Sequence, residues 1–286
     1  MTRRMGNRVS SLVENMAHET IYTPPIVNYT RRSCSFTTTK DGDSIAMRLY
    51  SDTAEAEARF CAAEPTKSTR DLVIFSHGNG SDIGGMHRFC EHLCSALDID
   101  VLVYDYPQYG HSSVGKASEK KLVASLEAVF EACLQLGWTQ TRIFLMGHSL
   151  GSVPTVHLAS KPQCRVSGVV LLAPLASGSR VFLQDSRYVP KWVAGSMDFL
   201  LFNNIDKIGD VSSPIAIVHG TGDNVVSVAN TEALKLKIRE ACSYTTLFVT
   251  CGHNDLVDVH SRDLMRITEY IKRFRQKCLL CVVNES

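Results

Sequence analysis

The pentapeptide Gly147-His148-Ser149-Leu150-Gly151 joins a short apolar run to a helical stretch. Residues 143–146 are typical of a buried strand, and residues 152–159 are typical of a helix. The turn between them is so sharp that a side chain at either glycine would collide with neighbouring backbone. A serine there takes a strained conformation that lifts its hydroxyl clear of the sheet. Glycine and serine also mark ordinary turns, so the flanking strand and helix carry this prediction.

Short apolar strands alternate with helices along most of the chain. After a hairpin of residues 35–39 and 45–50, strands are predicted over residues 72–76, 101–104, 143–146, 168–172, 215–218 and 245–249. Helices are predicted over residues 83–97, 122–133, 152–159 and 264–274. Such an alternation indicates an α/β fold, in which a mostly parallel central sheet is flanked by helices on both faces.

A chain of 286 residues, 44% of them hydrophobic, suffices for one such domain. We expect an irregular segment over residues 1–30, the α/β domain over residues 31–276 and a tail over residues 277–286. Residues 51–70 are rich in Ala, Glu, Ser and Thr without a clear apolar face. This composition predicts a mobile surface insertion.

The composition excludes several kinds of protein. A net charge of +1 provides no basic field for nucleic acid. No apolar run is long enough to span a bilayer, and the first residues lack the apolar core of a secretory signal. The ten cysteines are scattered and no pair has the companions of a zinc site, so we expect free thiols in a reducing cytosol. We therefore expect a monomeric cytoplasmic protein with no metal, no cofactor and no nucleic-acid partner.

Two later loops carry the residue types that activate a serine. A hydroxyl nucleophile needs a base, and the base needs an acid that orients it. Asp223 follows the strand at 215–218, and His253 follows the final strand. Because the carboxyl ends of parallel strands share one edge of a sheet, Ser149, Asp223 and His253 can converge there. Their order along the chain is that of an α/β-hydrolase fold, so we predict this fold and a catalytic role for all three.

Other residues compete for two of these roles. Asp223 is alternatively a turn residue, with Asp255 or Asp258 orienting the base. The histidines that compete with His253 are His77, His111, His148, His157, His219 and His260. The sharp turn should direct the side chain of His148 elsewhere, and the histidines at strand ends more commonly bond to loops. Only His253 lies in the loop after the final strand, which favours it.

The loop after the first long strand, residues 76–82, is rich in glycine. Its backbone can approach a tetrahedral intermediate, and one of its amides should join that of Leu150 in an oxyanion hole. We favour the amide of Asn79, with Gly80 second; the alternative is a plain glycine-rich turn before a helix. A dinucleotide site is disfavoured, because the third glycine of that fingerprint is absent at the required spacing.

Residues 177–213 interrupt the alternation of strands and helices. They carry several large apolar side chains, namely Phe182, Tyr188, Trp192, Phe199, Leu200, Leu201 and Phe202. We expect a small lid insertion in which some of these side chains roof an acyl pocket above Ser149. The alternative is a crossover helix whose apolar residues belong to the core.

Longer motifs surround the catalytic candidates. They are Phe75-Ser76-His77-Gly78-Asn79, Tyr104-Asp105-Tyr106 with Tyr109-Gly110, Val153-Pro154, residues 173–181, residues 204–208, residues 219–223 and Gly252-His253-Asn254-Asp255. With these motifs the chain resembles the α/β-hydrolase-domain-containing 17 family, from about residue 23 to residue 274. The resemblance implies a serine hydrolase that removes palmitate from protein cysteines and works on the cytosolic face of membranes. It also implies Ser149, Asp223 and His253 as the catalytic residues and an S-acylated protein or acyl ester as the substrate.

The chain departs from this family at three places. His148 stands where the family usually has glutamine, and the lid region is longer. The acylated N-terminal cysteine cluster is missing, since the first cysteine is Cys34. Residues 5–10 match an N-myristoylation motif if translation starts at Met5, which gives the hypothesis that a myristate on Gly6 replaces the cluster.

A single myristate binds membranes weakly, so a second signal is expected. The basic residues within 272–277, followed by Cys278 and Cys281, offer one through attraction to anionic lipid and acylation. The alternative is a solvated helix face followed by a packed tail.

Two other functions stay open at this point. One is a small-ester or monoacylglycerol esterase with the same three catalytic residues. The other is a non-catalytic, membrane-associated interaction module that keeps only the hydrolase fold.

Overall fold

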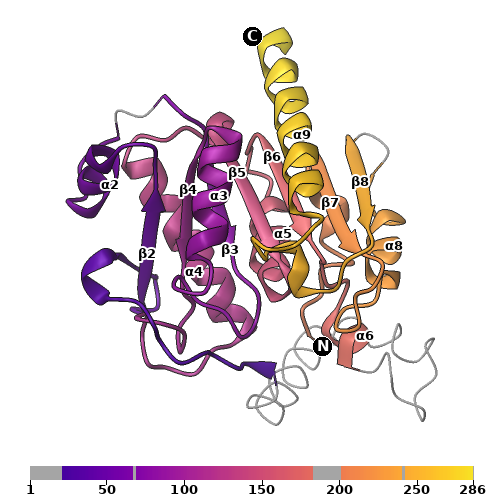
Figure 1. Cartoon of the computed structure of the whole chain (residues 1–286), viewed down its shortest axis with the longest axis horizontal. Helices are drawn as coiled ribbons and strands as arrows, with labels where there is room; N and C mark the ends of the chain where they lie inside the picture. The colour runs from indigo at the N-terminus through magenta and orange to yellow at the C-terminus, as the bar shows by residue number, and fades with distance from the viewer. Residues whose placement is uncertain (1–20, 67–68, 183–200, 240–241, 286) are drawn as a thin grey trace.

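An eight-stranded sheet runs through the centre of the protein (Figure 1). The computed structural model describes residues 21–66, 69–182, 201–239 and 242–285. The strands are β1 (Ser35–Thr38), β2 (Ser44–Tyr50), β3 (Leu72–Ser76), β4 (Asp100–Tyr104), β5 (Ile143–His148), β6 (Gly168–Leu172), β7 (Ile215–Gly220) and β8 (Tyr244–Val249). Their order across the sheet is β1-β2-β4-β3-β5-β6-β7-β8. The β1–β2 and β2–β4 pairs are antiparallel and the other five pairs are parallel, so the predicted mostly parallel sheet is confirmed.

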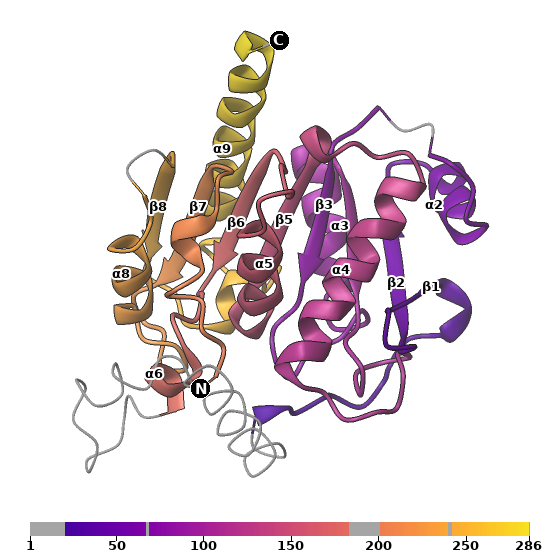
Figure 2. The same ribbon diagram turned by 180° about the vertical axis from the view of Figure 1, so that it is seen from behind.

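Helices cover both faces of this sheet. They are α2 (Ala54–Cys61), α3 (His87–Leu97), α4 (Glu119–Gln135), α5 (Ser152–Ala159), α6 (Gly178–Phe182), α8 (Ala229–Lys235) and α9 (Leu264–Glu285). Helices α3 and α9 lie on the face toward the viewer in Figure 1. Helices α4, α5 and α8 lie on the opposite face, which Figure 2 shows. The two-sided cover explains why the parallel strands are apolar at almost every position.

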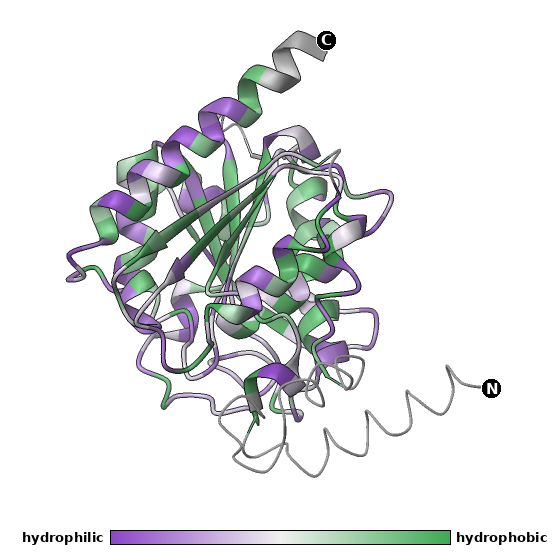
Figure 3. Ribbon diagram, turned by 90° about the vertical axis from the view of Figure 1, so that its right-hand side faces the viewer, coloured by the Kyte–Doolittle hydropathy of each residue, from purple (hydrophilic) through white to green (hydrophobic). Residues whose placement is uncertain are grey.

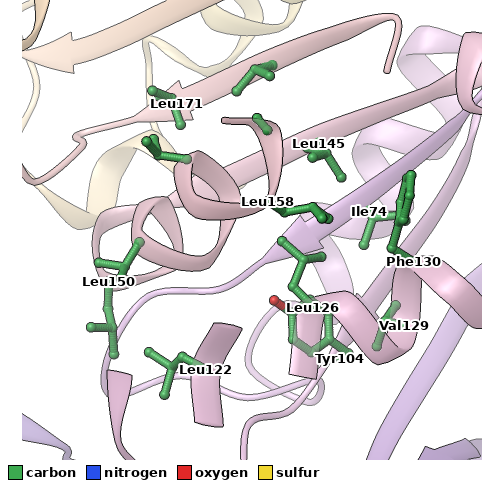
Figure 4. Packing of buried hydrophobic residues seen from close by; sticks show 14 of the residues in the cluster. Ile74, Tyr104, Leu122, Leu126, Val129, Phe130, Leu145, Leu150, Leu158 and Leu171 are labelled. Carbon is green, nitrogen blue, oxygen red and sulfur yellow. The ribbon is translucent and has the colours of Figure 1, made fainter. Parts of the chain in front are cut away.

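Successive residues of one strand supply the two cores in turn. In β5, Leu145 packs into the core under α4 and α5, whereas Phe144 and Met146 pack into the core under α3 and α9. Figure 4 shows Leu145 and Ile74 of the sheet beside Leu126 of α4. Seen from the side, the strands are coloured largely as hydrophobic, whereas many hydrophilic residues lie on the outer helices and loops (Figure 3). The side chains of both cores are close-packed and almost fully removed from solvent.

Residues 51–70 contain regular structure that the sequence did not indicate. Helix α2 begins after Thr53, whose side chain accepts a hydrogen bond from the amide of Ala56. One aromatic residue anchors the helix, since Phe60 is 3% exposed and its ring packs edge-on against that of Trp138, with centroids 6.4 Å apart. The expectation of a mobile insertion is wrong here, because a single buried ring leaves no periodic apolar face to read.

Helix α9 continues to Glu285, through the residues expected to form a separate tail. Its buried positions include Phe274 and Cys278, and Arg275 pairs with Asp71 at 2.8 Å. Cys278 is 3% exposed, so its thiol is not available for acylation in this conformation. The described ranges hold no helix with both the length and the hydropathy needed to cross a bilayer.

The predicted lid is described only at its two ends. Helix α6 begins it, and the 3-10 helix η4 (Ile208–Asp210) lies near its end. Leu201 and Phe202 are 5% and 1% exposed and belong to the core. For these two residues the core alternative holds. Tyr188, Trp192, Phe199, Leu200 and the side chain of Phe182 lie outside what is described, as do residues 1–20 with the Gly6 motif.

Candidate active site

The predicted sharp turn lies directly after β5. Ser149 has a φ of +51°, in the left-handed region that a residue with a side chain rarely adopts. A Cβ added at Gly147 would lie 2.5 Å from the carbonyl oxygen of Gly151, and one at Gly151 would lie 2.0 Å from that of Ser76. Only glycine therefore fits at positions 147 and 151. The turn sits at the lower edge of the sheet in Figure 1, where the parallel strands end.

Three side chains from separate loops form one hydrogen-bonded chain. His253 Nε2 lies 2.9 Å from Ser149 Oγ, and His253 Nδ1 lies 2.6 Å from Asp223 Oδ2. Ser149 and His253 are 8% and 7% exposed, and the side chain of Asp223 is fully buried. The serine follows β5, the aspartate follows β7 and the histidine follows β8. The structure thus brings together the three residues that the sequence proposed as catalytic.

Asp223 is held as an anion in a specific orientation. Its Oδ1 accepts hydrogen bonds from the amides of Val225 (2.9 Å) and Val226 (2.8 Å). Burial by itself raises the pKa of Asp223, but the hydrogen bonds from His219 and His253 outweigh it and hold this pKa below its ordinary value. A carboxylate fixed in this way orients the His253 ring and stabilises its protonated form.

The two alternative acids bind backbone in their own loops. Asp255 Oδ2 accepts a hydrogen bond from the amide of Gly252 at 2.7 Å, and Asp258 Oδ1 accepts one from the amide of His260 at 2.9 Å. His219 behaves as the sequence suggested for a histidine at a strand end. Its ring bonds to the hydroxyl of Thr231 and the carbonyl of Val226. Only Asp223 therefore faces the His253 ring.

The loop after β3 comes close to Ser149. A Cβ added at Gly78 would lie 3.5 Å from Ser149 Cβ and 2.8 Å from His148 Nδ1. The missing side chain lets the backbone of Gly78 and Asn79 pass beside the serine. Leu150, the other predicted donor, follows Ser149 in the short 3-10 helix η3 (Ser149–Gly151). Both predicted amides thus belong to segments that adjoin the serine.

Tyr106 and Asp105, for which no role was expected, hold the loop after β3 in place. Tyr106 donates its hydroxyl hydrogen to the carbonyl of His77 at 2.8 Å. Asp105 accepts a hydrogen bond from the amide of Ile83 at 2.9 Å, and its carboxylate lies 3.4 Å from His77 Nε2. The sequence did contain a pattern that could have indicated these roles. Both residues come directly after the apolar strand β4, at the edge of the sheet where functional side chains gather.

His148 does not turn away from the site, contrary to the sequence expectation. Its ring packs against that of His253, with centroids 5.0 Å apart, and its Nε2 donates to the His253 carbonyl oxygen at 3.3 Å. Burial, aided by the nearby His253, lowers the pKa of His148 to about 3. His148 is therefore neutral near pH 7 and ties the turn to the loop that carries the base.

The lowered pKa of His148 predicts how the stability of the protein depends on pH. Between about pH 3 and the ordinary value of 6.5, unfolded His148 binds a proton that the folded residue does not. The contribution of neutral His148 to the free energy of unfolding is therefore complete above about pH 6.5. It falls as the pH drops below that value, by at most about 1.4 kcal/mol per pH unit. Urea unfolding near pH 7 and near pH 4.5 should show a weaker pH dependence for His148→Gln than for the wild type. The exposed His260→Gln serves as the control, and equal slopes for all three proteins would contradict the prediction.

Comparisons with known proteins agree with the fold. The hydrolase family model described as serine aminopeptidase, S33, matches residues 67–204. The chain is 39% identical to α/β hydrolase domain-containing protein 17C of Xenopus tropicalis over 205 residues, which cover 71% of this chain and 62% of the relative. It is 33% identical to human α/β hydrolase domain-containing protein 17B over 244 residues, which cover 84% and 75%. The chain belongs to the α/β-hydrolase-domain-containing 17 family. It spans about three fifths of the length of the 17C relatives that it matches, for instance 59% of the human protein.

Solved structures show the same fold at low sequence identity. An esterase from Pyrococcus furiosus superposes with a TM-score of 0.67 and 16% identity, over 91% of this chain and 98% of that one. Est1E from Butyrivibrio proteoclasticus, solved with ferulic acid bound, superposes with a TM-score of 0.63 and 16% identity, over 85% and 99%. This chain and these esterases therefore share the α/β-hydrolase architecture.

Proposed function

We propose that this protein is a serine hydrolase that cleaves acyl thioesters and removes palmitate from S-acylated proteins. The observation that carries the proposal is the continuous chain of hydrogen bonds from Ser149 through His253 to Asp223. In an unbroken chain of this kind the base can accept the serine proton while the acid stabilises the charge that forms. The choice of a palmitoyl thioester is supported by membership of the 17 family and the motifs shared with it.

In the first half of the reaction Ser149 becomes acylated. Its Oγ attacks the acyl carbonyl carbon while His253 Nε2 takes the hydroxyl proton. The carbonyl oxygen becomes an oxyanion that accepts hydrogen bonds from the amides of Leu150 and Asn79. When the intermediate collapses, the carbon–sulfur bond breaks and the proton on His253 passes to the leaving sulfur. A thiolate leaves more easily than an alkoxide, so a thioester demands less acid help from His253.

In the second half, water releases the fatty acid. His253 removes a proton from a water molecule, whose oxygen attacks the acyl carbon bound to Ser149. The same two amides stabilise the second oxyanion. Collapse breaks the bond to Ser149 Oγ, which regains its proton from His253. The products are a free thiol and a carboxylic acid, and the enzyme returns to its starting state.

The substrate class is tested by comparing acyl leaving groups. The purified protein is assayed with a palmitoyl-thioester peptide, p-nitrophenyl esters of increasing chain length and a monoacylglycerol. We expect the highest kcat/KM with the palmitoyl thioester. A preference for short esters or for the monoacylglycerol would favour the esterase alternative. Failure to react with a fluorophosphonate probe, which requires an activated serine, would favour the non-catalytic alternative.

A protein thioesterase of this kind has its substrates at membranes, so we propose that it acts as a monomer on the cytosolic face. We place the attachment in the N-terminal segment, through a myristate on Gly6. Intact-mass measurement on protein from its native source should show a chain that begins at Gly6 with an added myristoyl group. A chain that begins at Met1 or Thr2 would refute this mode of attachment.

A further inference from the structure

The side chain of Asn79 is bound by residues far away in the sequence. Its Nδ2 donates to the carbonyl of Ile21 at 2.6 Å, and its Oδ1 accepts from the amide of Thr23 at 3.0 Å. The same Oδ1 accepts the hydroxyl hydrogen of Tyr109 at 2.5 Å. The side-chain amide thus makes three hydrogen bonds, and none of them involves the catalytic residues. Its contacts indicate that it holds the loop rather than the substrate.

Residues 21–23, which bind the side chain of Asn79, are themselves firmly packed. Ile21 and Tyr22 are 3% and 2% exposed, and the Tyr22 ring meets that of Phe202 edge-on with centroids 6.2 Å apart. Pro24 and Pro25 follow directly and restrict the backbone. Residues 21–23 therefore form a fixed bridge between the Asn79 loop and the end of the lid region.

Tyr109 holds Asn79 from the other side. Its ring is fully buried and packs edge-on against Tyr106, with centroids 5.5 Å apart. Burial raises the pKa of Tyr109, so its hydroxyl stays protonated and donates to Asn79. Tyr106 meanwhile bonds to the carbonyl of His77, two residues earlier in the same loop. Two neighbouring tyrosines thus hold successive parts of the loop that passes Ser149.

We propose that Asn79 is a positioning residue, whose side chain orients its own backbone amide toward the oxyanion on the Ser149-bound substrate. The proposal rests on the hydrolase function given above. The side chain and the amide share one Cα, so releasing the side chain lets the peptide plane rotate. Misplacing a hydrogen-bond donor that acts mainly in the transition state lowers kcat and leaves KM nearly unchanged. Residues 21–23 and Tyr109 therefore contribute indirectly to stabilising the oxyanion, because they hold the side chain of Asn79.

A double-mutant cycle on the full chain tests this coupling with a short p-nitrophenyl ester. Asn79→Ala should lower kcat about a hundredfold with little change in KM, as expected when one oxyanion donor is misplaced. Tyr109→Phe should lower kcat by roughly tenfold, because one of the three hydrogen bonds is lost. In the double variant, Tyr109→Phe should add nothing to Asn79→Ala, because the hydroxyl acts only through Asn79.

The matched control is Tyr50→Phe. Tyr50 is 3% exposed and its hydroxyl lies 3.2 Å from His87 Nδ1 at the start of α3, so this variant removes a buried tyrosine hydroxyl elsewhere. It should keep the wild-type kcat. Thermal unfolding of each variant shows whether the protein is folded in the assay.

Several outcomes would overturn the proposal. An unchanged kcat in folded Tyr109→Phe would do so even if Asn79→Ala failed to fold. Fully multiplicative losses in the double variant would also overturn it, because they would show that Tyr109 acts independently of Asn79. So would an equal loss in Tyr50→Phe, because it would indicate a general structural effect. A wild-type protein that neither hydrolyses the ester nor reacts with a fluorophosphonate overturns the hydrolase function itself, which separates that failure from a failure of the Asn79 coupling.

Discussion

Replacing Ser149 by alanine should abolish hydrolysis and leave the fold intact. Alanine has no oxygen that could attack the acyl carbon, so no acyl-enzyme forms. We expect kcat for a p-nitrophenyl ester to fall by at least about 10⁴-fold. Labelling by a fluorophosphonate probe should disappear as well. The side chain shrinks by one oxygen at a position 8% exposed, so the thermal unfolding midpoint should change by only a few degrees.

Ser160→Ala is the matched control for this experiment. Ser160 follows the end of α5, the helix that comes directly after the turn at Ser149, and its hydroxyl donates to the carbonyl of His157 at 2.9 Å. This variant should retain wild-type activity and probe labelling. If Ser149→Ala kept more than a few per cent of the wild-type activity, Ser149 would not be the nucleophile.

The second large effect is expected for Asp223→Asn. Two backbone amides donate to Oδ1 of Asp223, so the amide oxygen of an asparagine should remain at that position. The NH₂ group then replaces Oδ2 and faces His253 Nδ1 across 2.6 Å. His253 must now accept at Nδ1 and carry its hydrogen on Nε2, where it cannot take the serine proton. We expect kcat to fall about 10⁴-fold while the protein stays folded.

Asp255→Asn separates this effect from a general loss of charge near the base. Asp255 bonds to the amide of Gly252, beside His253, without facing the histidine ring. Its replacement should lower kcat less than about tenfold, since an amide oxygen can still accept that hydrogen bond. Equal losses in the two variants would contradict the assignment of Asp223 as the acid that orients His253.

The inner strands β3 to β7 were predictable because each is a short run in which every residue is buried. The strand expected over residues 168–172 is found as β6 with the same bounds, and the one expected over residues 143–146 ends two residues later, at His148. Helix α2 was missed because Phe60 is its only buried residue. Local pattern therefore reveals an element well when many of its positions are buried, and poorly when a single contact anchors it.

The sequence by itself determined the α/β architecture, the sharp turn at Ser149 and the loops that carry Asp223 and His253. These follow from hydrophobic patterning and from the order of residue types, which are local properties. Tertiary structure alone decided which carboxylate faces His253, where the His148 ring lies and what holds Asn79. Each of these depends on contacts between residues 30 to 105 positions apart, such as the 105 that separate His148 from His253 and the 56 that separate Thr23 from Asn79. Such contacts are set when the sheet and its helices pack together, and no pattern within a single segment encodes them.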